Sequence, residues 1–201
     1  MCHGCGGCFA VCPKKALSRG ARILGELETG VTLGGKHSFI MGRARIGEAM
    51  STPQLRELHK YLNNLSSNGE DVLIDAPPGV SCPAMTAARD VDVILLVAEP
   101  TPFGFHDFKL ACQAFGHLKK PLPVVLNRAG IPGNQQGDNE LKEYCQQTGL
   151  PVLTELPFDR DAARHYAQGL VLASLSSTWN ERFTALRNAL QDFWYREHIN
   201  A

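Results

Sequence analysis

Apolar positions follow two patterns along the chain, and each pattern predicts one kind of secondary structure. Between Thr52 and Leu65 the leucines recur every three or four residues, which predicts an amphipathic helix. Further on, four short apolar runs are rich in β-branched residues and lack polar alternation, as is typical of parallel strands covered on both faces. These expected strands are residues 72–74, 91–98, 122–126 and 151–156.

Helical patterns alternate with the expected strands, and this alternation predicts the fold class. Two of the helices run up to a glycine, Gly149 or Gly169, which is a common residue just past a helix end. Repeated strand–helix units predict an α/β fold with a mostly parallel sheet, right-handed crossovers and helices on both faces. The expected helices are residues 105–118, 139–148, 159–168 and 176–198.

The overall composition is that of a globular chain without net charge. Of the 201 residues 44% are hydrophobic, enough to build a core. Lys+Arg and Asp+Glu are both 20, and the resulting net charge of zero argues against a nucleic-acid partner. The longest apolar run, 93–98, is far shorter than the ~18 residues that a membrane span needs, so no span is expected.

Seven cysteines are distributed unevenly, and four of them fall within residues 2–12. This pattern differs from a secreted disulfide framework and favours a reducing, cytoplasmic location in which thiolates bind metal. The spacing Cys2-x2-Cys5-x2-Cys8-x3-Cys12-Pro13 is the bacterial ferredoxin run, which ligates a [4Fe–4S] cluster. Zinc is the alternative metal, although zinc sites usually separate two cysteine pairs by a longer loop.

The last cysteine of the run leaves the number of clusters open. In ferredoxins with two such runs, the cysteine before proline ligates the other cluster. Only one run is present here, so Cys12 either closes its own cluster or lacks its partner run.

A different chemistry is indicated where an apolar run ends on a carboxylate, in "LIDAPPGVSCP", residues 73–83. Asp75 in this position is typical of a group that holds Mg²⁺ directly or through water at the ligand-binding edge of an α/β sheet. Gly79 allows a backbone N–H to approach a phosphate. The alternative is structural: Asp75 caps the following turn and the prolines stiffen it.

The sequence contains no clear phosphate-binding loop with its lysine. The stretch "GVTLGGKHS", Gly30 to Ser38, matches G-x4-G-K, but His37 stands where a serine or threonine would bind Mg²⁺. An extended pattern follows it instead of a helix. We therefore interpret this stretch as a surface turn.

Several stretches together resemble one family. "LIDAPPGVSCP", "VILLVAEPTPFGFHDFKLA", "VVLNRAG" and "LPFDRDAARHYAQG" follow the cysteine run. Their order and spacing are similar to the MinD/ParA-type P-loop ATPases of the SIMIBI class that carry an inserted ferredoxin module. The similarity covers nearly the whole chain and is weakest after about residue 174. In that family a phosphate loop and another cysteine run come earlier, so the chain resembles an N-terminally truncated member that lacks the first strand.

The resemblance implies three segments. Residues 1–17 correspond to a partial ferredoxin-type iron–sulfur segment and residues 18–50 to a connecting segment. Residues 51–201 correspond to the C-terminal part of the P-loop ATPase domain.

The resemblance also implies roles for single residues. Asp75 matches the aspartate that orients Mg²⁺ and the attacking water, and Pro78 and Gly79 match the nucleotide-sensing switch. Asn127 matches the asparagine that binds adenine, whose edge suits an amide donor and acceptor; the alternative for this residue is a turn-forming strand end. Residues 99–101 match the loop after the strand beside the switch. The loop beside the base is matched by Pro157, Phe158 and Asp159.

Two functions fit these observations. The first is an ATP-binding switch, with ATP and Mg²⁺, coupled to electron transfer or cluster delivery. Its hydrolysis is expected to be deficient because no lysine is placed to neutralise phosphate charge. It implies a homodimer, or a partner that supplies the phosphate loop, and a redox or cluster-transfer partner. The second is a non-catalytic ferredoxin-like electron-transfer or iron–sulfur carrier protein with an α/β docking scaffold.

Overall fold

The computed structural model describes residues 5–32, 35, 37–48, 50–65 and 71–199. The chain divides into two compact units, each considered by itself. The first unit is Met1–Pro77 with Cys82–Ala87, and the second is Pro78–Ser81 with Ala88–Ala201.

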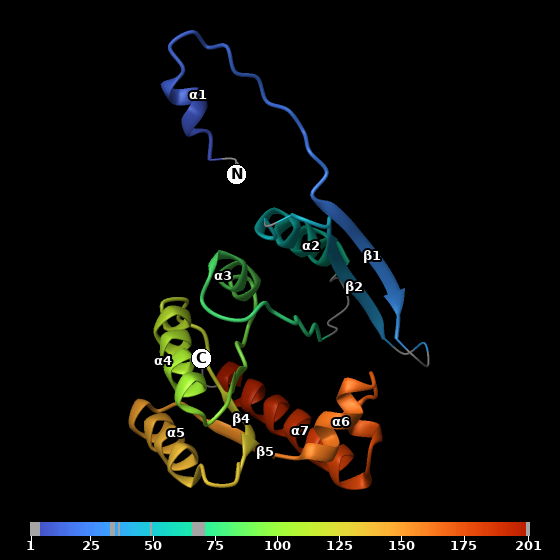
Figure 1. The fold of residues 1–201 in the computed structure, drawn as a ribbon, viewed down its shortest axis with the longest axis vertical. Coiled ribbons are helices and arrows are strands. Elements are labelled where there is room, and N and C mark those ends of the chain that lie inside the picture. Colours follow the sequence, from blue (N-terminus) through green and yellow to red (C-terminus); the bar gives the residue numbers. More distant parts are fainter. Residues whose placement is uncertain (1–4, 33–34, 36, 49, 66–70, 200–201) are drawn as a thin grey trace. The chain divides into compact units, whose positions relative to one another are not determined.

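A β-hairpin and one helix make up most of the first unit. Strand β1 (Gly25–Val31) pairs antiparallel with β2 (Ser38–Ala44), and helix α2 (Thr52–Leu65) packs against β2 (Figure 1). Gln54 ties helix to hairpin by donating from Nε2 to the Glu26 carbonyl at 3.2 Å. The bounds of α2 are those that the leucine spacing predicts.

The turn of this hairpin is the stretch that resembles a phosphate loop. Thr32 donates its N–H to the His37 carbonyl at 2.8 Å, which closes the turn between the two strands. The described part of this stretch thus joins two antiparallel strands, as expected of a turn, and strand β2 follows it; residues 33, 34 and 36 lie outside the described residues.

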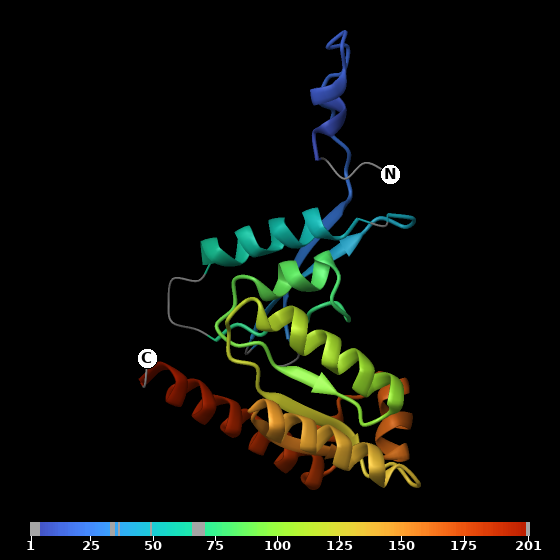
Figure 2. The same cartoon turned by 90° about the vertical axis from the view of Figure 1, so that its left-hand side faces the viewer.

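A parallel sheet forms the centre of the second unit. Its strands are β3 (Leu96–Ala98), β4 (Val124–Ala129) and β5 (Val152–Pro157), in the order β3-β4-β5. Figures 1 and 2 show α4 and α5 on one side of this sheet and α7 on the other. The helices of this unit are α4 (Pro102–Gly116), α5 (Gln135–Thr148), α6 (Arg160–Ala167) and α7 (Ser177–Ile199), with the short 3-10 turn η1 (Leu172–Ser174).

The core of the second unit fills both faces of β4. Val125 packs with Leu156 of β5, Ala162 of α6 and Trp179 of α7. Neighbouring residues of a strand point to opposite faces, so the fully buried Val124 and Leu126 lie toward the other side. The predicted α/β fold with a parallel sheet between helices is thus confirmed. Among the described residues, no helix has both the length and the apolar character to cross a membrane.

One expected strand does not form. Residues 72–74 belong to no helix or strand, and Leu73 is 91% exposed. A strand needs a neighbour for its backbone hydrogen bonds, and among the described strands none pairs with this segment. Similarly, only the last three residues of the expected strand 91–98 pair, as β3. Helix α3 (Cys82–Ala88) follows the switch segment.

Candidate functional site

The candidate site lies at the carboxyl ends of β3 and β4, where open parallel sheets bind ligands. We call this region the sheet rim; it consists of residues 99–101, residues 127–134 and the first turn of α5. Thr101 starts α4 as its N-cap, accepting from the Gly104 N–H at 3.0 Å. The rim loops are therefore continuous with the helices that cover the sheet.

The two loops of the rim, residues 99–101 and 127–134, pack closely against each other. The Asn134 side chain donates from Nδ2 to the Pro100 carbonyl. A Cβ added at Gly137 would lie inside van der Waals distance of that carbonyl oxygen, and 2.8–2.9 Å from the Asn134 amide. Asp138, only 7% exposed, accepts from the Gly130 N–H at 3.1 and 3.2 Å. Contacts of this kind hold the loop after β4 in one conformation.

Strand β4 carries a bulge within the rim. Leu126 faces Glu155 and Ala129 faces Pro157, so two residues of β4 oppose one of β5. Arg128, one of the two, has a φ of 59°, a left-handed conformation that is uncommon for a residue with a side chain. Bulges often re-aim side chains beside active sites.

The two bulge residues make different contacts. The Asn127 Oδ1 accepts from the Arg128 N–H at 3.1 Å, which folds the amide back onto the bulge. The Arg128 guanidinium forms an ion pair with the Glu99 carboxylate: Nη1 donates to Oε2 at 3.3 Å, and Nε lies 3.3 Å from Oε1. The ends of β3 and β4 are thereby joined by an ion pair. The sequence predicted a role for Asn127 but not for Arg128 or Asp138. A cluster of glycines and polar residues after strand β4 was the signal in the sequence that this loop is tightly structured.

The third predicted loop joins the rim through the main chain. Phe158 donates its N–H to the Ala129 carbonyl at 2.8 Å, and both Pro157 and Phe158 are half-buried. The structure thus brings these two residues beside the bulge that carries Asn127.

Asp159 has a structural role in the same loop. Its carboxylate accepts from the Asp161 and Ala162 N–H groups at 2.8 and 3.1 Å, so Asp159 is the N-cap of α6. It also accepts from the Trp179 indole at 3.1 Å. These hydrogen bonds, led by the one from Ala162, lower the pKa of Asp159.

The predicted switch residues lie before this rim in the sequence. Asp75 is exposed and belongs to the first unit, whereas Pro78 and Gly79 belong to the second. Gly79 has a φ of 79°, a conformation that suits glycine. Their arrangement about a shared ligand stays a prediction.

In its described part, residues 5–17, the cysteine segment contains one short helix, α1 (Gly7–Val11). Cys8 lies in this helix and Cys12 caps its end, whereas Cys5 precedes it; Cys2 lies outside the described residues. Cys5 and Cys8 are exposed free thiols, and Cys12 is partly exposed. Thiolates at this spacing fit an iron–sulfur cluster in donor chemistry, but the described residues include no group of three side chains gathered to hold a metal.

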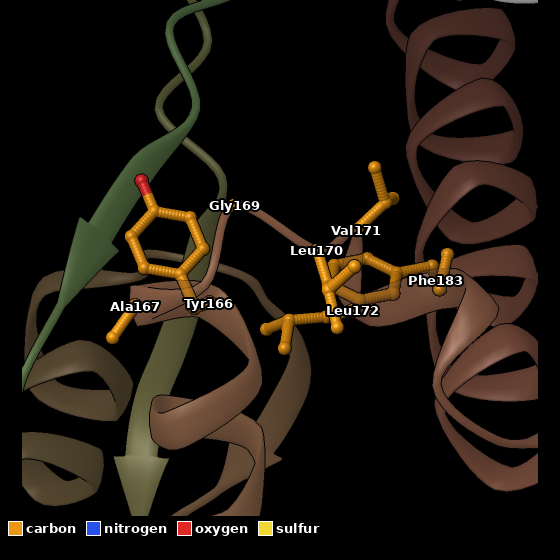
Figure 3. A pocket seen from close by; sticks show the side chains of 8 residues that line it. Tyr166, Ala167, Gly169, Leu170, Val171, Leu172 and Phe183 are labelled. Carbon is orange, nitrogen blue, oxygen red and sulfur yellow. The ribbon is translucent and has the colours of Figure 1, made fainter.

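A hollow on the surface lies away from the predicted site residues. It is an apolar groove of about 730 Å³ between the end of α6, the η1 segment and α7 (Figure 3). Figure 3 shows Leu170, Leu172 and Phe183 grouped on one side of it and Tyr166 on the other. None of the residues predicted to bind nucleotide lines this groove.

Comparison with solved structures defines the class of fold. The chain is similar to the cell-division ATPase MinD of Pyrococcus furiosus, with a TM-score of 0.54, 21% identity and coverage of 69% of this chain and 59% of that one. It is also similar to the MinD cell division protein of Aquifex aeolicus, with a TM-score of 0.56, 14% identity and coverage of 75% and 66%. At these identities the likeness establishes the fold alone: a MinD-like P-loop NTPase fold.

Curated proteins of Methanocaldococcus jannaschii are similar in sequence. The uncharacterised protein MJ0579 is 30% identical over 131 residues, which are 65% of this chain and 43% of that protein. The uncharacterised protein MJ0578 is 24% identical, covering 77% and 51%. The uncharacterised ATP-binding protein MJ0685 is 24% identical, covering 59% and 46%. The chain therefore spans about half the length of these relatives, and no family model matches it.

Proposed function

We propose that the chain is the base-binding part of an adenine-nucleotide switch coupled to an iron–sulfur centre. The observation that carries this proposal is the sheet rim of a MinD-like fold, with Asn127 on a bulge at the carboxyl end of β4. The name of the relative MJ0685, an ATP-binding protein, agrees with it.

Each part of the rim has a proposed role toward the nucleotide. The Asn127 Oδ1 already accepts from the Arg128 N–H, so its Nδ2 group donates to a ring nitrogen of adenine. Pro157 and Phe158, held beside the bulge, flank the base. Asp159 fixes this loop through its bonds to α6 and Trp179 instead of contacting the nucleotide.

The switch residues complete the proposed site. Asp75 orients Mg²⁺ and the attacking water, since a carboxylate oxygen is a ligand that Mg²⁺ prefers. Pro78 and Gly79 respond to the terminal phosphate, because Gly79 has no Cβ to hinder the approach of a phosphate to its N–H.

Phosphate binding comes from a segment outside these 201 residues or from a partner chain. The lysine-containing stretch 30–38 is a hairpin turn, and hydrolysis by the present residues alone is therefore deficient. Strand β3 lies at an edge of the described sheet, in the order β3-β4-β5, and Val97 on it is 61% exposed. An open edge strand is a place where a further strand can be added.

The iron–sulfur part of the proposal rests on the cysteine run. Cys2, Cys5, Cys8 and Cys12 hold a [4Fe–4S] cluster, which supplies electron transfer or is itself delivered to a redox or cluster-transfer partner. The exposure of Cys5 and Cys8 leaves both thiols accessible for cluster assembly.

Nucleotide binding is tested with the full chain and adenosine, ATP and GTP at millimolar concentration. Saturation-transfer NMR is suited to the weak binding expected without a phosphate loop. We expect signal transfer to adenosine and ATP, and its loss in N127A with the melting temperature retained. A fragment that carries a phosphate-loop strand and helix is expected to raise the affinity for ATP. Absence of any adenosine or ATP signal from the wild-type chain would reject the nucleotide role.

Cluster binding is tested separately by anaerobic reconstitution with iron and sulfide. We expect a brown protein with four iron atoms per cluster, and loss of the visible absorbance in C5S and C8S but not in the control C145S, which changes a buried cysteine of α5. Colourless protein with bound zinc would support the zinc alternative. A cluster without nucleotide binding would support the electron-transfer or carrier function instead.

A further inference from the structure

The charges of the chain are distributed unevenly along the sequence. Residues 1–25 contain no aspartate or glutamate, whereas the chain as a whole has no net charge, so the remaining residues are net acidic. The basic residues of this stretch are Lys14, Lys15, Arg19 and Arg22. Positive charge and the cysteine run therefore occur together, in the same short part of the sequence.

Only one of these charges is neutralised by a described residue. Arg22 Nη2 lies 2.6 Å from Glu48 Oε2, and the Glu48 side chain is 7% exposed. Lys14, Lys15 and Arg19 are exposed, and in the described part of the chain none of them forms an ion pair. These three positive charges are thus uncompensated at the surface.

The basic segment folds back onto the helix that carries a cysteine. The Lys15 N–H donates to the Cys12 carbonyl at 3.2 Å, which turns the chain directly after α1. The guanidinium carbon of Arg19 lies 5.9 Å from the centre of the Phe9 ring, a contact between a cation and an aromatic ring. The charges therefore lie beside α1, the helix that contains Cys8.

Apolar side chains are exposed on the same segment. Phe9 is 38% exposed, Val11 78% and Leu17 48%. Apolar residues with a polar rim are typical of surfaces that bind proteins, whereas surfaces that bind nucleic acids are more polar and more strongly positive. Apolar and basic side chains together therefore favour a protein as the partner, and the uncompensated positive charge favours an acidic one.

We propose that residues 9–19 form a docking surface for an acidic protein. Phe9, Val11 and Leu17 make its apolar contacts, and the side chains of Lys14, Lys15 and Arg19 pair with carboxylates of the partner. The inference rests on the proposed iron–sulfur function in one respect, which makes this partner a redox or cluster-transfer protein. Charges of this kind steer the encounter and orient the partner toward the exposed Cys5 and Cys8.

Binding is measured with the isotope-labelled full chain by NMR titration at low salt. The acidic probe is a plant-type [2Fe–2S] ferredoxin, and cytochrome c is the basic comparison. A short DNA duplex and vesicles of phosphatidylcholine and phosphatidylserine test the other anionic partners. The triple variant K14Q/K15Q/R19Q is compared with R56Q/R89Q/K119Q, which removes the same charge from exposed positions elsewhere.

Ferredoxin is expected to shift the resonances of residues 9–19, and cytochrome c is expected to leave them unchanged. K14Q/K15Q/R19Q is expected to weaken ferredoxin binding about tenfold, as for the loss of three exposed ion pairs. Raising the salt from about 20 to 200 mM is expected to weaken the wild type similarly. The control triple variant is expected to bind like the wild type.

A variant without a change of charge tests the apolar part of the surface. V11S is expected to weaken ferredoxin binding about two- to threefold and to keep the salt dependence, because it removes apolar contact area only. Unchanged ferredoxin binding in V11S would overturn the apolar contact. Melting temperatures equal to that of the wild type are expected for all three variants, because the altered side chains are exposed.

Several outcomes would overturn the docking surface. These are a wild-type chain that does not bind ferredoxin, equal weakening in both triple variants, and tighter binding to DNA or to the vesicles than to ferredoxin. Salt-sensitive self-association without any probe would assign the surface to the acidic remainder of a second copy instead. The iron–sulfur function fails separately: a chain that stays colourless after reconstitution, yet loses ferredoxin binding only in K14Q/K15Q/R19Q, would reject the cluster and support the docking surface.

Discussion

The close packing of the rim leads to a prediction about Gly137, the third residue of α5. In most helix positions a change from glycine to alanine stabilises by up to about 1 kcal/mol. Here the added methyl group would overlap the Pro100 carbonyl oxygen and lie 2.8–2.9 Å from the Asn134 amide. Ordinary contacts begin near 3.4 Å, so the backbone of the neighbouring loop has to move.

The expected cost follows from what this movement breaks. The hydrogen bond from Asn134 to the Pro100 carbonyl contributes about 1 kcal/mol, and overpacking costs about 1–3 kcal/mol. After the gain in helix propensity, G137A is expected to lower the free energy of unfolding by about 1–3 kcal/mol. The matched control is G116A at the end of α4, where no atom lies within 4 Å of the added Cβ. This variant is expected to be neutral or stabilised by up to about 1 kcal/mol.

The assay is urea unfolding followed by the fluorescence of Trp179, which is buried in the core of the same unit. The urea midpoints of G137A and G116A are expected to move in opposite directions at an unchanged slope. A G137A midpoint equal to or above that of the wild type would contradict the packing of the rim. An adenosine affinity that falls in G137A, but not in G116A, would further connect this packing with the site.

Two further predictions concern ionisable groups in the second unit. The hydrogen bond from the Ala162 N–H is the largest cause that lowers the pKa of Asp159 below its usual 3.8. The ionised carboxylate therefore stabilises the fold fully above pH 3.8, and this stabilisation is lost as the pH falls through the lowered pKa of the folded state. Urea midpoints of wild type and D159N should therefore converge below about pH 4; a constant difference would argue against this role. Burial raises the pKa of Cys112 and Cys145 to about 11, so iodoacetamide at pH 8 should label the exposed Cys82 well before either. Equal labelling rates, measured by peptide mass spectrometry, would contradict the burial of these thiols.

Local patterns in the sequence were sufficient for one helix of the first unit and for most of the second unit. The helix Thr52–Leu65 and the long helix α7 were predicted because their apolar residues recur at helical spacing over several turns. The end of α5 was also predicted, because glycine is common just past a helix end. In the structure Gly149 adopts the left-handed conformation that this position favours. These features depend on neighbours within the same segment.

Other features depend on pairing between distant segments, and the sequence did not show them. The expected strand 72–74 has strand-like residues, yet it stays unpaired because no described strand lies along it. The bulge at Asn127 and Arg128 exists only through the register of β4 with β5. For the same reason the asparagine was found from its motif, whereas the contact between Arg128 and Glu99, 29 residues apart, was not.

The tight rim also has a use in tracing ancestry. Asn127, Gly130, Asn134, Gly137 and Asp138 each fill a separate steric or hydrogen-bonding requirement within twelve consecutive residues. A genome searched for this spaced string, N-x2-G-x3-N-x2-G-D after a β-branched run, should yield remote homologues that share the architecture even where the lysine-bearing loop has diverged beyond recognition.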